Sequence, residues 1–259
     1  MSFDTPIDYA ATLSRLLPRQ HTTIACHILE NGEKVWLRKV GKTVPQWRYV
    51  LLGMLSRRLK LGALQPVPNL GGQTALDTEA CRLQHFAVLG IPAPKLLAQQ
   101  KGGLLFSHLG DTTLLNELEH AADPIVCWQD GLYALAAVHA KGSYLSQAFV
   151  RNIIRMPQGN IGFIDFEDDP GSVMSLENCQ IRDWLCYLQS SVIWLKQRGL
   201  MCETVAAWQN HEALLPPEIR RQLYRSTKKI AFLRGIESER FGNDTLRLAA
   251  MAELFYRCG

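Results

Sequence analysis

Residues 149–170 read FVRNIIRMPQGNIGFIDFEDDP, and the fold and chemistry of this chain depend on this stretch. Short apolar runs flank Pro157-Gln158-Gly159-Asn160, a pattern typical of two strands joined by a turn. If that four-residue turn sets the register, Asn152 faces Asp165 across the hairpin, where opposed Cβ atoms lie about 4.5–5.5 Å apart. Amide and carboxylate oxygens suit Mg²⁺, which leaves much of its shell to phosphates and water. The pair predicts a metal site, with an acidic surface turn capped by Asn152 as the alternative.

The rest of the chain divides into a β-rich first half and a mostly helical second half, which predicts an α+β fold of two lobes with a cleft. Asn31-Gly32 supplies the positive φ angles of a tight hairpin turn. Thr74 can cap a helix that Gly90 and Pro92 end. We expect strands over 22–30, 33–40, 95–98, 103–107, 153–156 and 161–164, and helices over 5–18, 74–89, 124–141 and most of the chain after 176.

Glu79 falls on the apolar stripe of the helix that follows Thr74. Removing water from a carboxylate costs several kcal/mol unless a cation or hydrogen-bond donors compensate. Glu79 therefore needs a partner. In the strand over 33–40, side-chain alternation leaves open whether Arg38 or Lys39 faces the cleft.

Asp165-Phe166-Glu167, preceded by Asn152 and followed by a helix with Asp183, resembles the protein-kinase-like fold, in which an Asp-Phe-Gly segment and a catalytic-loop Asn hold the metal. The chain looks most like small bacterial kinases of the lipopolysaccharide core kinase and RIO-like atypical type, over about 35–188. The resemblance implies one kinase-like domain over 1–259. Its small β-rich N-lobe would cover about 1–107, with a basic helical insertion at 43–65, and its larger, mostly helical C-lobe would cover about 111–259.

The resemblance also implies ATP and Mg²⁺ as ligands and assigns roles to single residues. Asn152 and Asp165 would bind the metal. Arg38 or Lys39 would hold the nucleotide phosphates, with Glu79 as the partner of that cation. The segment 106–110, with Ser107 and Leu109, would be the hinge that reads adenine, and Asp183 would brace the catalytic loop.

Three features depart from the kinase pattern. Gln147 stands where active kinases carry a catalytic Asp; a glutamine can orient a hydroxyl but cannot accept its proton at neutral pH. No Gly-x-Gly-x-x-Gly segment precedes the strand cations, so backbone clamping of the phosphates is either missing or supplied by another loop, such as Gly71-Gly72. Glu167 replaces the glycine of the Asp-Phe-Gly segment and adds a carboxylate near the metal.

Two functional classes follow from this pattern. The first is a phosphotransferase acting on a hydroxyl of a sugar, lipid-linked or protein acceptor in a bacterial cell, with Gln147 positioning that hydroxyl. The second is a pseudokinase that regulates or scaffolds another protein, which the substitution at Gln147 favours. The fold does not choose between them.

Composition and charge indicate where the protein is located and which partners it has. No apolar run reaches the length of a membrane span and no secretory signal is seen, so we expect a cytoplasmic protein. No nucleic-acid motif accompanies the charge, so no nucleic acid is expected. The segment 45–60 has the pattern of an amphipathic basic helix, which could lie on an anionic membrane at its inner face or form a solvated surface. Between residues 34 and 76 the chain has no acid, and its bases are Lys34, Arg38, Lys39, Lys42, Arg48, Arg57, Arg58 and Lys60.

Overall fold

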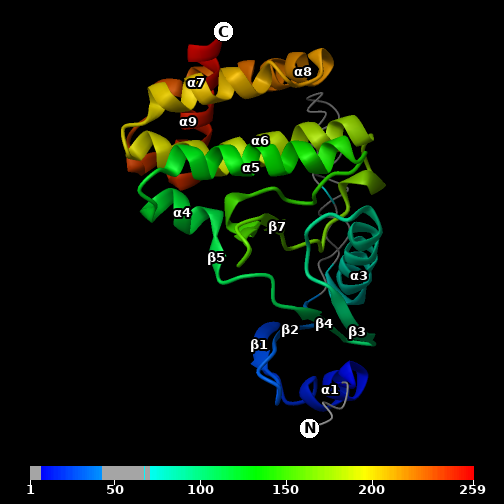
Figure 1. The fold of residues 1–259 in the computed structure, drawn as a ribbon. Coiled ribbons are helices and arrows are strands. Elements are labelled where there is room, and N and C mark those ends of the chain that lie inside the picture. Colours follow the sequence, from blue (N-terminus) through cyan, green and yellow to red (C-terminus); the bar gives the residue numbers. More distant parts are fainter. Residues whose placement is uncertain (1–6, 43–66, 68–70) are drawn as a thin grey trace.

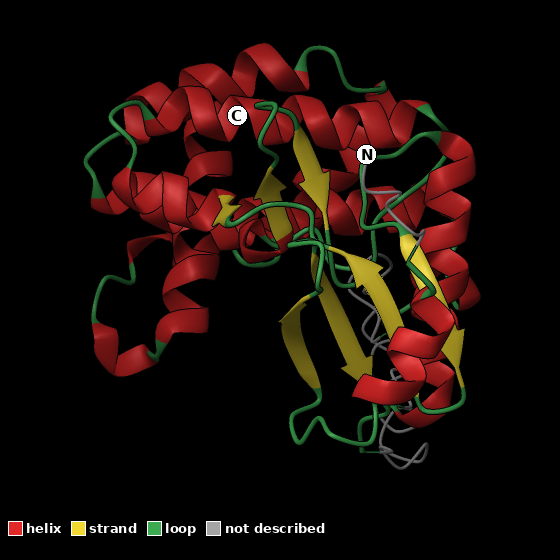
Figure 2. Cartoon of the chain, turned by 60° about the horizontal axis from the view of Figure 1, so that its bottom comes forward, coloured by secondary structure: helices red, strands yellow, loops and turns green. Residues whose placement is uncertain are grey.

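The chain forms two lobes joined by the segment after residue 107, in a computed structural model that describes residues 7–42, 67 and 71–259 (Figure 1). One antiparallel sheet is the basis of the smaller lobe, and the larger lobe is mostly helical, which confirms the predicted α+β two-lobed fold (Figure 2). The basic insertion expected at 43–65, with its membrane contact through 45–60, lies outside the described residues. None of the described helices is long and apolar enough to cross a bilayer.

The sheet of the smaller lobe has the strand order β1-β2-β4-β3. Asn31-Gly32 lies in the turn between β1 and β2 as predicted, and Gly32 has the φ of 83° that favours glycine. Helix α1 packs on one face of this sheet and helix α3 on the other. The bounds are Tyr9–Leu16 for α1, Ile24–Ile28 for β1, Lys34–Lys39 for β2, Gly72–Leu89 for α3, Leu96–Gln100 for β3 and Gly103–Ser107 for β4.

Side chains of β2 alternate between the two faces of this sheet. Val35 and Leu37 are fully buried in the core beneath α1. Trp36 and Arg38 lie on the other face, where they line a cavity between the lobes. Because successive strand residues point to opposite faces, Lys39 lies on the α1 side with Leu37.

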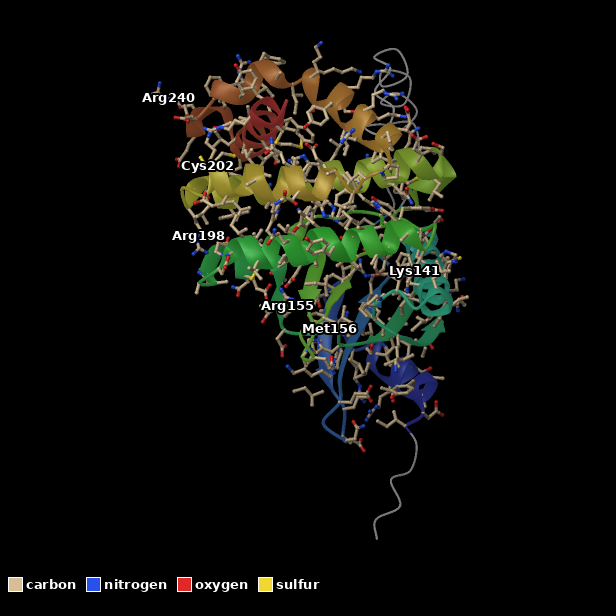
Figure 3. All side chains as sticks on the ribbon, turned by 45° about the horizontal axis from the view of Figure 1, so that its top comes forward. Lys141, Arg155, Met156, Arg198, Cys202 and Arg240 are labelled. Carbon is tan, nitrogen blue, oxygen red and sulfur yellow. The ribbon has the colours of Figure 1, made fainter. Side chains whose placement is uncertain are left out.

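Helix α3 is fastened to the larger lobe at its C-terminal end. The helix ends at Gly90, which has a left-handed φ of 62°, as the sequence predicts. Lys141, which follows α5, donates hydrogen bonds from Nζ to the carbonyl oxygens of Leu89 at 2.8 Å and Gly90 at 2.7 Å (Figure 3). At the other end the N-cap is Gly71 and not the expected Thr74, because the helix already begins at Gly72.

The larger lobe joins a three-stranded antiparallel sheet, in the order β5-β6-β7, to a set of helices. Arg155 of β6 ties this sheet to α4 and α5, because its Nη2 lies 2.8 Å from Glu117 and 2.9 Å from Asp130 (Figure 3). The bounds are Thr112–Thr113 for β5, Leu114–His120 for α4, Pro124–Ala140 for α5, Ile153–Arg155 for β6, Ile161–Phe163 for β7, Leu176–Gln197 for α6, Met201–Glu212 for α7, Pro217–Lys228 for α8 and Asn243–Cys258 for α9, with short 3₁₀ turns at Val150–Asn152, Pro170–Ser172, Ala231–Gly235 and Glu239–Phe241.

The register of the β6–β7 hairpin differs by one residue from the prediction. Met156 donates its N–H to the carbonyl of Asn160 at 2.8 Å, so the loop has three residues instead of four. Its last residue, Gly159, has a φ of 88°, as three-residue hairpin loops often require. Asn152 is consequently opposite Ile164 and not opposite Asp165. The backbone carbonyl of Asn152 accepts the N–H of Ile164 at 2.9 Å.

A buried histidine lies in the helical core. His211 of α7 is 3% exposed, and its ring centroid lies 5.1 Å from that of Trp184, 5.5 Å from Tyr133 and 6.0 Å from Trp208. Within the described residues neither of its ring nitrogens has a hydrogen-bond partner. Burial lowers the pKa of His211 to about 4, with a smaller contribution from the positive charge of His139.

We expect this histidine to make the protein less stable in mild acid. Above its folded pKa His211 is neutral, whereas an unfolded histidine binds a proton up to a pH of about 6.5. The unfolded state thus binds more protons between these two values, so the free energy of unfolding should rise across that window by about 1–3 kcal/mol. Urea unfolding at several pH values measures this slope. His211→Phe should flatten it and His21→Phe, at an exposed site, should not; an unchanged slope in His211→Phe would contradict the assignment.

Candidate functional site

Glu79 of α3 has the partner that its burial demands. The residue is 2% exposed, and its Oε2 lies 2.9 Å from Arg38 Nε. Burial raises the pKa of Glu79, and the positive charge of Arg38 and a hydrogen bond from the backbone of Phe166 oppose that rise. Strand β2, helix α3 and the segment after β7 therefore meet at one carboxylate.

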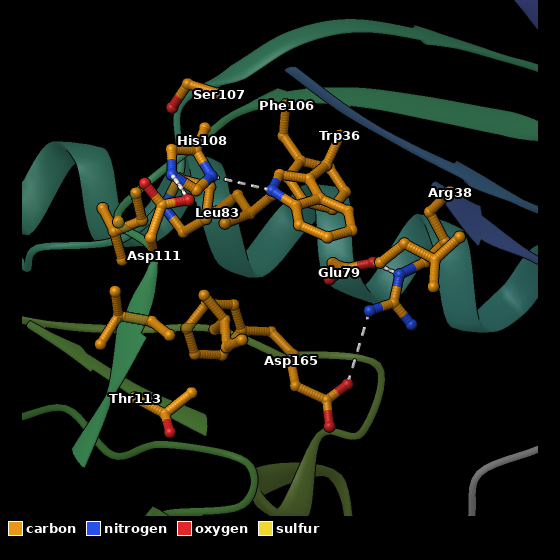
Figure 4. A pocket seen from close by; sticks show the side chains of 17 residues that line it. Trp36, Arg38, Glu79, Leu83, Phe106, Ser107, His108, Asp111, Thr113 and Asp165 are labelled. Atoms are coloured by element: carbon orange, nitrogen blue, oxygen red, sulfur yellow. Dashed lines mark hydrogen bonds and ion pairs between the residues drawn. The ribbon is translucent and has the colours of Figure 1, made fainter. Parts of the chain in front are cut away.

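Arg38 is surrounded by three carboxylates from two segments of the chain, and Figure 4 shows two of them, Glu79 and Asp165. Besides Glu79, its guanidinium contacts Asp165, at 3.6 Å between Nη2 and Oδ1, and Glu167. The guanidinium can serve all three because it presents five N–H groups in a fixed plane. Three carboxylates against one guanidinium leave this point of the cleft with an excess of negative charge.

The structure separates the two cations that the sequence left as alternatives. Arg38 faces the cleft, whereas Lys39 lies on the other face of the sheet, where its Nζ donates to the carbonyl of Gln20 at 2.7 Å. Leu37 is buried beneath α1, and alternation along β2 places Lys39 on the same side. Arg38 is therefore the cation that reaches both Glu79 and Asp165.

Asn152 and Asp165 come together although they are not paired in the hairpin. Asp165 has a φ of 73°, and no other described non-glycine residue has a positive φ. This left-handed conformation, which aspartate tolerates better than most residues, turns the chain just after the strand. The Asn152 amide nitrogen then lies 3.3 Å from Asp165 Oδ2 and 3.2 Å from the carbonyl of Gln147.

The side chains of Asn152 and Asp165 fit a cation that takes few ligands from the protein. The amide nitrogen of Asn152 is engaged, which leaves its Oδ1 to face a cation, and the side chain of Asp165 is 31% exposed, so water and phosphate can reach it. Within the described ranges no three His, Cys, Asp or Glu side chains converge into a metal cluster. An amide oxygen and a carboxylate open to solvent are oxygen donors of the kind that Mg²⁺ takes from a protein, since phosphate and water can complete its shell.

Gln147 lies beside a carboxylate that the sequence pattern does not single out. Its Nε2 donates to Asp168 Oδ2 at 2.7 Å, and Asp168 is 7% exposed. The hydroxyl of Ser146 donates to the backbone carbonyl of Asp168. In the sequence Asp168 reads only as one of several acids in a turn.

Asp183 of α6 supports the loop that carries Gln147. It is fully buried, and its Oδ2 accepts the N–H of Leu145 at 2.7 Å and lies 3.1 Å from His139 Nε2. Burial raises the pKa of Asp183, and these hydrogen bonds oppose the rise. The loop contact implied by the kinase resemblance is thus present in the geometry.

A cavity of about 310 Å³ lies between the lobes next to Arg38 and Asp165 (Figure 4). Its wall is largely apolar. Trp36 forms one side and donates its indole N–H to His108 Nδ1 at 3.1 Å. Ser107 at the end of β4 and Leu109 of the linking segment line the cavity. Ser107 donates its N–H to the carbonyl of Lys95, but the N–H of Leu109 has no partner within the part of the chain described.

A second cavity, of about 340 Å³, shares Arg38 with the first. Lys39, Lys42 and Glu167 line it, and so do Gly71-Gly72 at the start of α3. Both glycines have positive φ, 63° and 61°. The Gly71-Gly72 loop, which the sequence offers as a substitute phosphate clamp, therefore lines a cavity that Arg38 also lines.

No known protein family matches the sequence, and no curated protein matches it either. Among solved structures, the crystal structure of WbdD is similar over 86% of this chain and 41% of that chain, with 16% sequence identity and a TM-score of 0.33. This chain thus spans less than half the length of that protein. So distant a likeness names no family and no substrate, and the chemistry of this chain is inferred below from the geometry of its own cleft.

Proposed function

We propose that this chain binds ATP with Mg²⁺ in the cleft between its lobes and is a kinase-like phosphotransferase onto a hydroxyl of a sugar, lipid-linked or protein acceptor. One observation carries the proposal. Arg38, held by a buried Glu79, lies between an apolar cavity on one side and Asp165 with Asn152 on the other. An apolar slot beside a fixed cation and two oxygen donors suits a base, a polyphosphate and a divalent cation in that order.

Each part of the cleft has a role in this proposal. The apolar cavity takes the adenine against Trp36, and the N–H of Leu109 is a donor available to the base. The guanidinium of Arg38 binds the phosphates, which continue toward Gly71-Gly72 in the second cavity. Bound Mg²⁺ would neutralise charge on the transferred phosphoryl group, and Asn152 with Asp165 would hold it.

The position of Gln147 favours a second candidate function. Loss of a general base costs about 10²–10⁴ in rate, and an amide is not a base. A protein that binds the nucleotide and turns it over slowly or not at all would be a pseudokinase, acting on a partner through its lobes. Transfer of radiolabelled phosphate from ATP to a cell extract separates the two functions, with Gln147→Asp expected to raise the rate in the first case.

Nucleotide binding is expected to depend strictly on Mg²⁺. Glu79, Asp165 and Glu167 outweigh the single charge of Arg38, so a polyphosphate alone meets net repulsion. In thermal unfolding, ATP with MgCl₂ at 100 times its Kd should stabilise the protein by about 2.7 kcal/mol. ATP with EDTA should produce little change.

The control for this measurement is Arg15→Met, which removes an exposed cation of α1 that lines neither of the two cavities. It should keep most of the ATP–Mg²⁺ stabilisation, whereas Arg38→Met should lose it. Absence of stabilisation in the parent protein under every condition would refute both candidate functions, since each requires the nucleotide site.

A further inference from the structure

The bond between Asp168 and Gln147 fixes which end of the Gln147 amide faces the carboxylate. An ionised carboxylate only accepts hydrogen bonds, so the nitrogen of the amide must face it. In the structure Gln147 Nε2 donates to Asp168 Oδ2 at 2.7 Å, so the amide nitrogen faces the carboxyl group. The carbonyl oxygen Oε1, on the same carbon, must then point away from Asp168.

The surroundings make this orientation rigid. Asp168 is 7% exposed and its backbone carbonyl is bonded by Ser146, the residue before Gln147. The backbone carbonyl of Gln147 accepts from Asn152, whose amide also donates to Asp165. A continuous chain of hydrogen bonds thus links Asp165, Asn152, Gln147 and Asp168. Within the described residues, Gln147 Oε1 accepts no hydrogen bond from a side chain or backbone donor.

We infer that Asp168 is a positioning residue, which holds Gln147 so that its Oε1 accepts the hydrogen bond of the acceptor hydroxyl. The inference rests on the proposed phosphotransfer. The hydroxyl oxygen forms the new bond to the γ-phosphorus while the bond from that phosphorus to the β–γ bridging oxygen breaks and ADP leaves with the electron pair. Gln147 cannot keep the hydroxyl proton, which passes to an oxygen of the transferred phosphoryl group. Gln147 and Asp168 thus orient the nucleophile and do not deprotonate it.

A double-mutant cycle tests the inference, with release of inorganic phosphate from ATP and Mg²⁺ as the readout and water as the acceptor. Gln147→Ala and Asp168→Asn should each lower kcat by about 10-fold or more, the usual cost of a hydrogen bond to a charged group, with the KM for ATP nearly unchanged. The substitution Asp168→Asn keeps the shape of the side chain but lets the Gln147 amide turn either way. In the Gln147→Ala background, Asp168→Asn should cause no further loss, because residues that act as one unit are not additive.

Two further variants distinguish orientation from general damage to the loop. Tyr144→Phe removes a neighbouring hydrogen bond of the same loop, 2.6 Å to Asp169, and should leave kcat unchanged. Gln147→Asp supplies a base, so a variant that combines it with Asp168→Asn should recover turnover relative to Asp168→Asn alone. The dependence of kcat on pH should show an additional titration in Gln147→Asp alone, because two adjacent carboxylates raise the pKa of one of them.

The outcomes that overturn the inference are distinct from those that overturn the proposed function. Additive losses, or an Asp168→Asn variant with the parent kcat, would show that Asp168 does not act through Gln147. A parent protein that ATP and Mg²⁺ stabilise but that releases no phosphate would also overturn the inference, while nucleotide binding would stand. If Asp168→Asn fails to fold, the dependence of kcat on pH decides whether Asp168 acts through residue 147. It is compared in the parent protein, Gln147→Ala and Gln147→Glu. A second carboxylate at position 147 must titrate together with Asp168 if the two side chains are in contact.

Discussion

Replacement of Arg38 by methionine is expected to lower the free energy of unfolding by about 3–5 kcal/mol, the typical cost of removing one partner from a buried ion pair. Methionine fills a similar volume but leaves Glu79, which is 2% exposed, without its cation. It also leaves Glu79, Asp165 and Glu167 to repel one another. Chemical denaturation measures the loss, and binding of ATP with Mg²⁺ should disappear in the same variant.

Two controls show whether the buried carboxylate is the cause. Arg38→Met combined with Glu79→Gln should recover most of the lost stability, because the neutral amide can still accept the backbone hydrogen bond of Phe166. The deficit of Arg38→Met should also shrink as the pH is lowered. Burial raises the pKa of Glu79, so its protonated form is favoured in the folded state, and the cost of its charge appears only as the pH rises through that pKa. A deficit that is independent of pH and of Glu79→Gln would point to lost packing instead.

Asp165→Asn should abolish the Mg²⁺-dependent part of the stabilisation by ATP, about 2.7 kcal/mol at 100 times the Kd of the parent protein. Asparagine has the same shape and tolerates the left-handed φ of 73° at this position, so the backbone should not change. Without ligand, the variant should be as stable as the parent protein or more stable. The reason is that it removes one of the three carboxylates that surround Arg38.

The two effects together, unchanged or higher stability without ligand and a lost response to Mg²⁺, distinguish a metal ligand from a structural residue. If Asp165 served mainly to hold Arg38, Asp165→Asn would lower the stability of the ligand-free protein and keep its response to Mg²⁺. Glu167→Gln is the matched control, because it removes another carboxylate from the same guanidinium. It should keep most of the response to ATP and Mg²⁺ while Asp165→Asn loses it.

The sequence is sufficient to predict the lobes because local signals agree with the overall fold. Asn31-Gly32 requires a tight turn, and Gly90 ends a helix, whatever the rest of the chain does. The order of strands before helices then follows from hydrophobic periodicity. The start of α3 could not be predicted as well, because Thr74 is a good cap by residue type but the helix extends past it to Gly72.

The candidate site was only partly predictable, since hydrogen bonding and backbone geometry decide its details. Asn152 and Asp165 lie together as predicted, but they are not paired in the hairpin, because the register differs from the predicted one by one residue. The turn at Asp165 compensates for that shift, and a positive φ at aspartate cannot be read from residue order.

The choice between Arg38 and Lys39 also needed three-dimensional information. Alternation along a strand gives two faces, but only the position of α1 shows that Lys39 lies on the face away from the cleft. The role of Asp168 could not be predicted from the sequence for a related reason. It lies 21 positions after Gln147, and no sequence pattern joins the two side chains that the fold brings to 2.7 Å.

The attachment of α3 to Lys141 has a mechanical consequence. Because Lys141 holds the C-terminal end of α3 at Leu89 and Gly90, a tilt of this helix against the sheet would pivot about that end. Glu79 lies ten residues from the pivot, a lever arm of about 15 Å, so a tilt of about 10° displaces its carboxylate by about 2.6 Å. A movement of that size is comparable to the whole 2.9 Å separation from Arg38. A small tilt of α3 against the sheet is thus enough to separate Glu79 from Arg38.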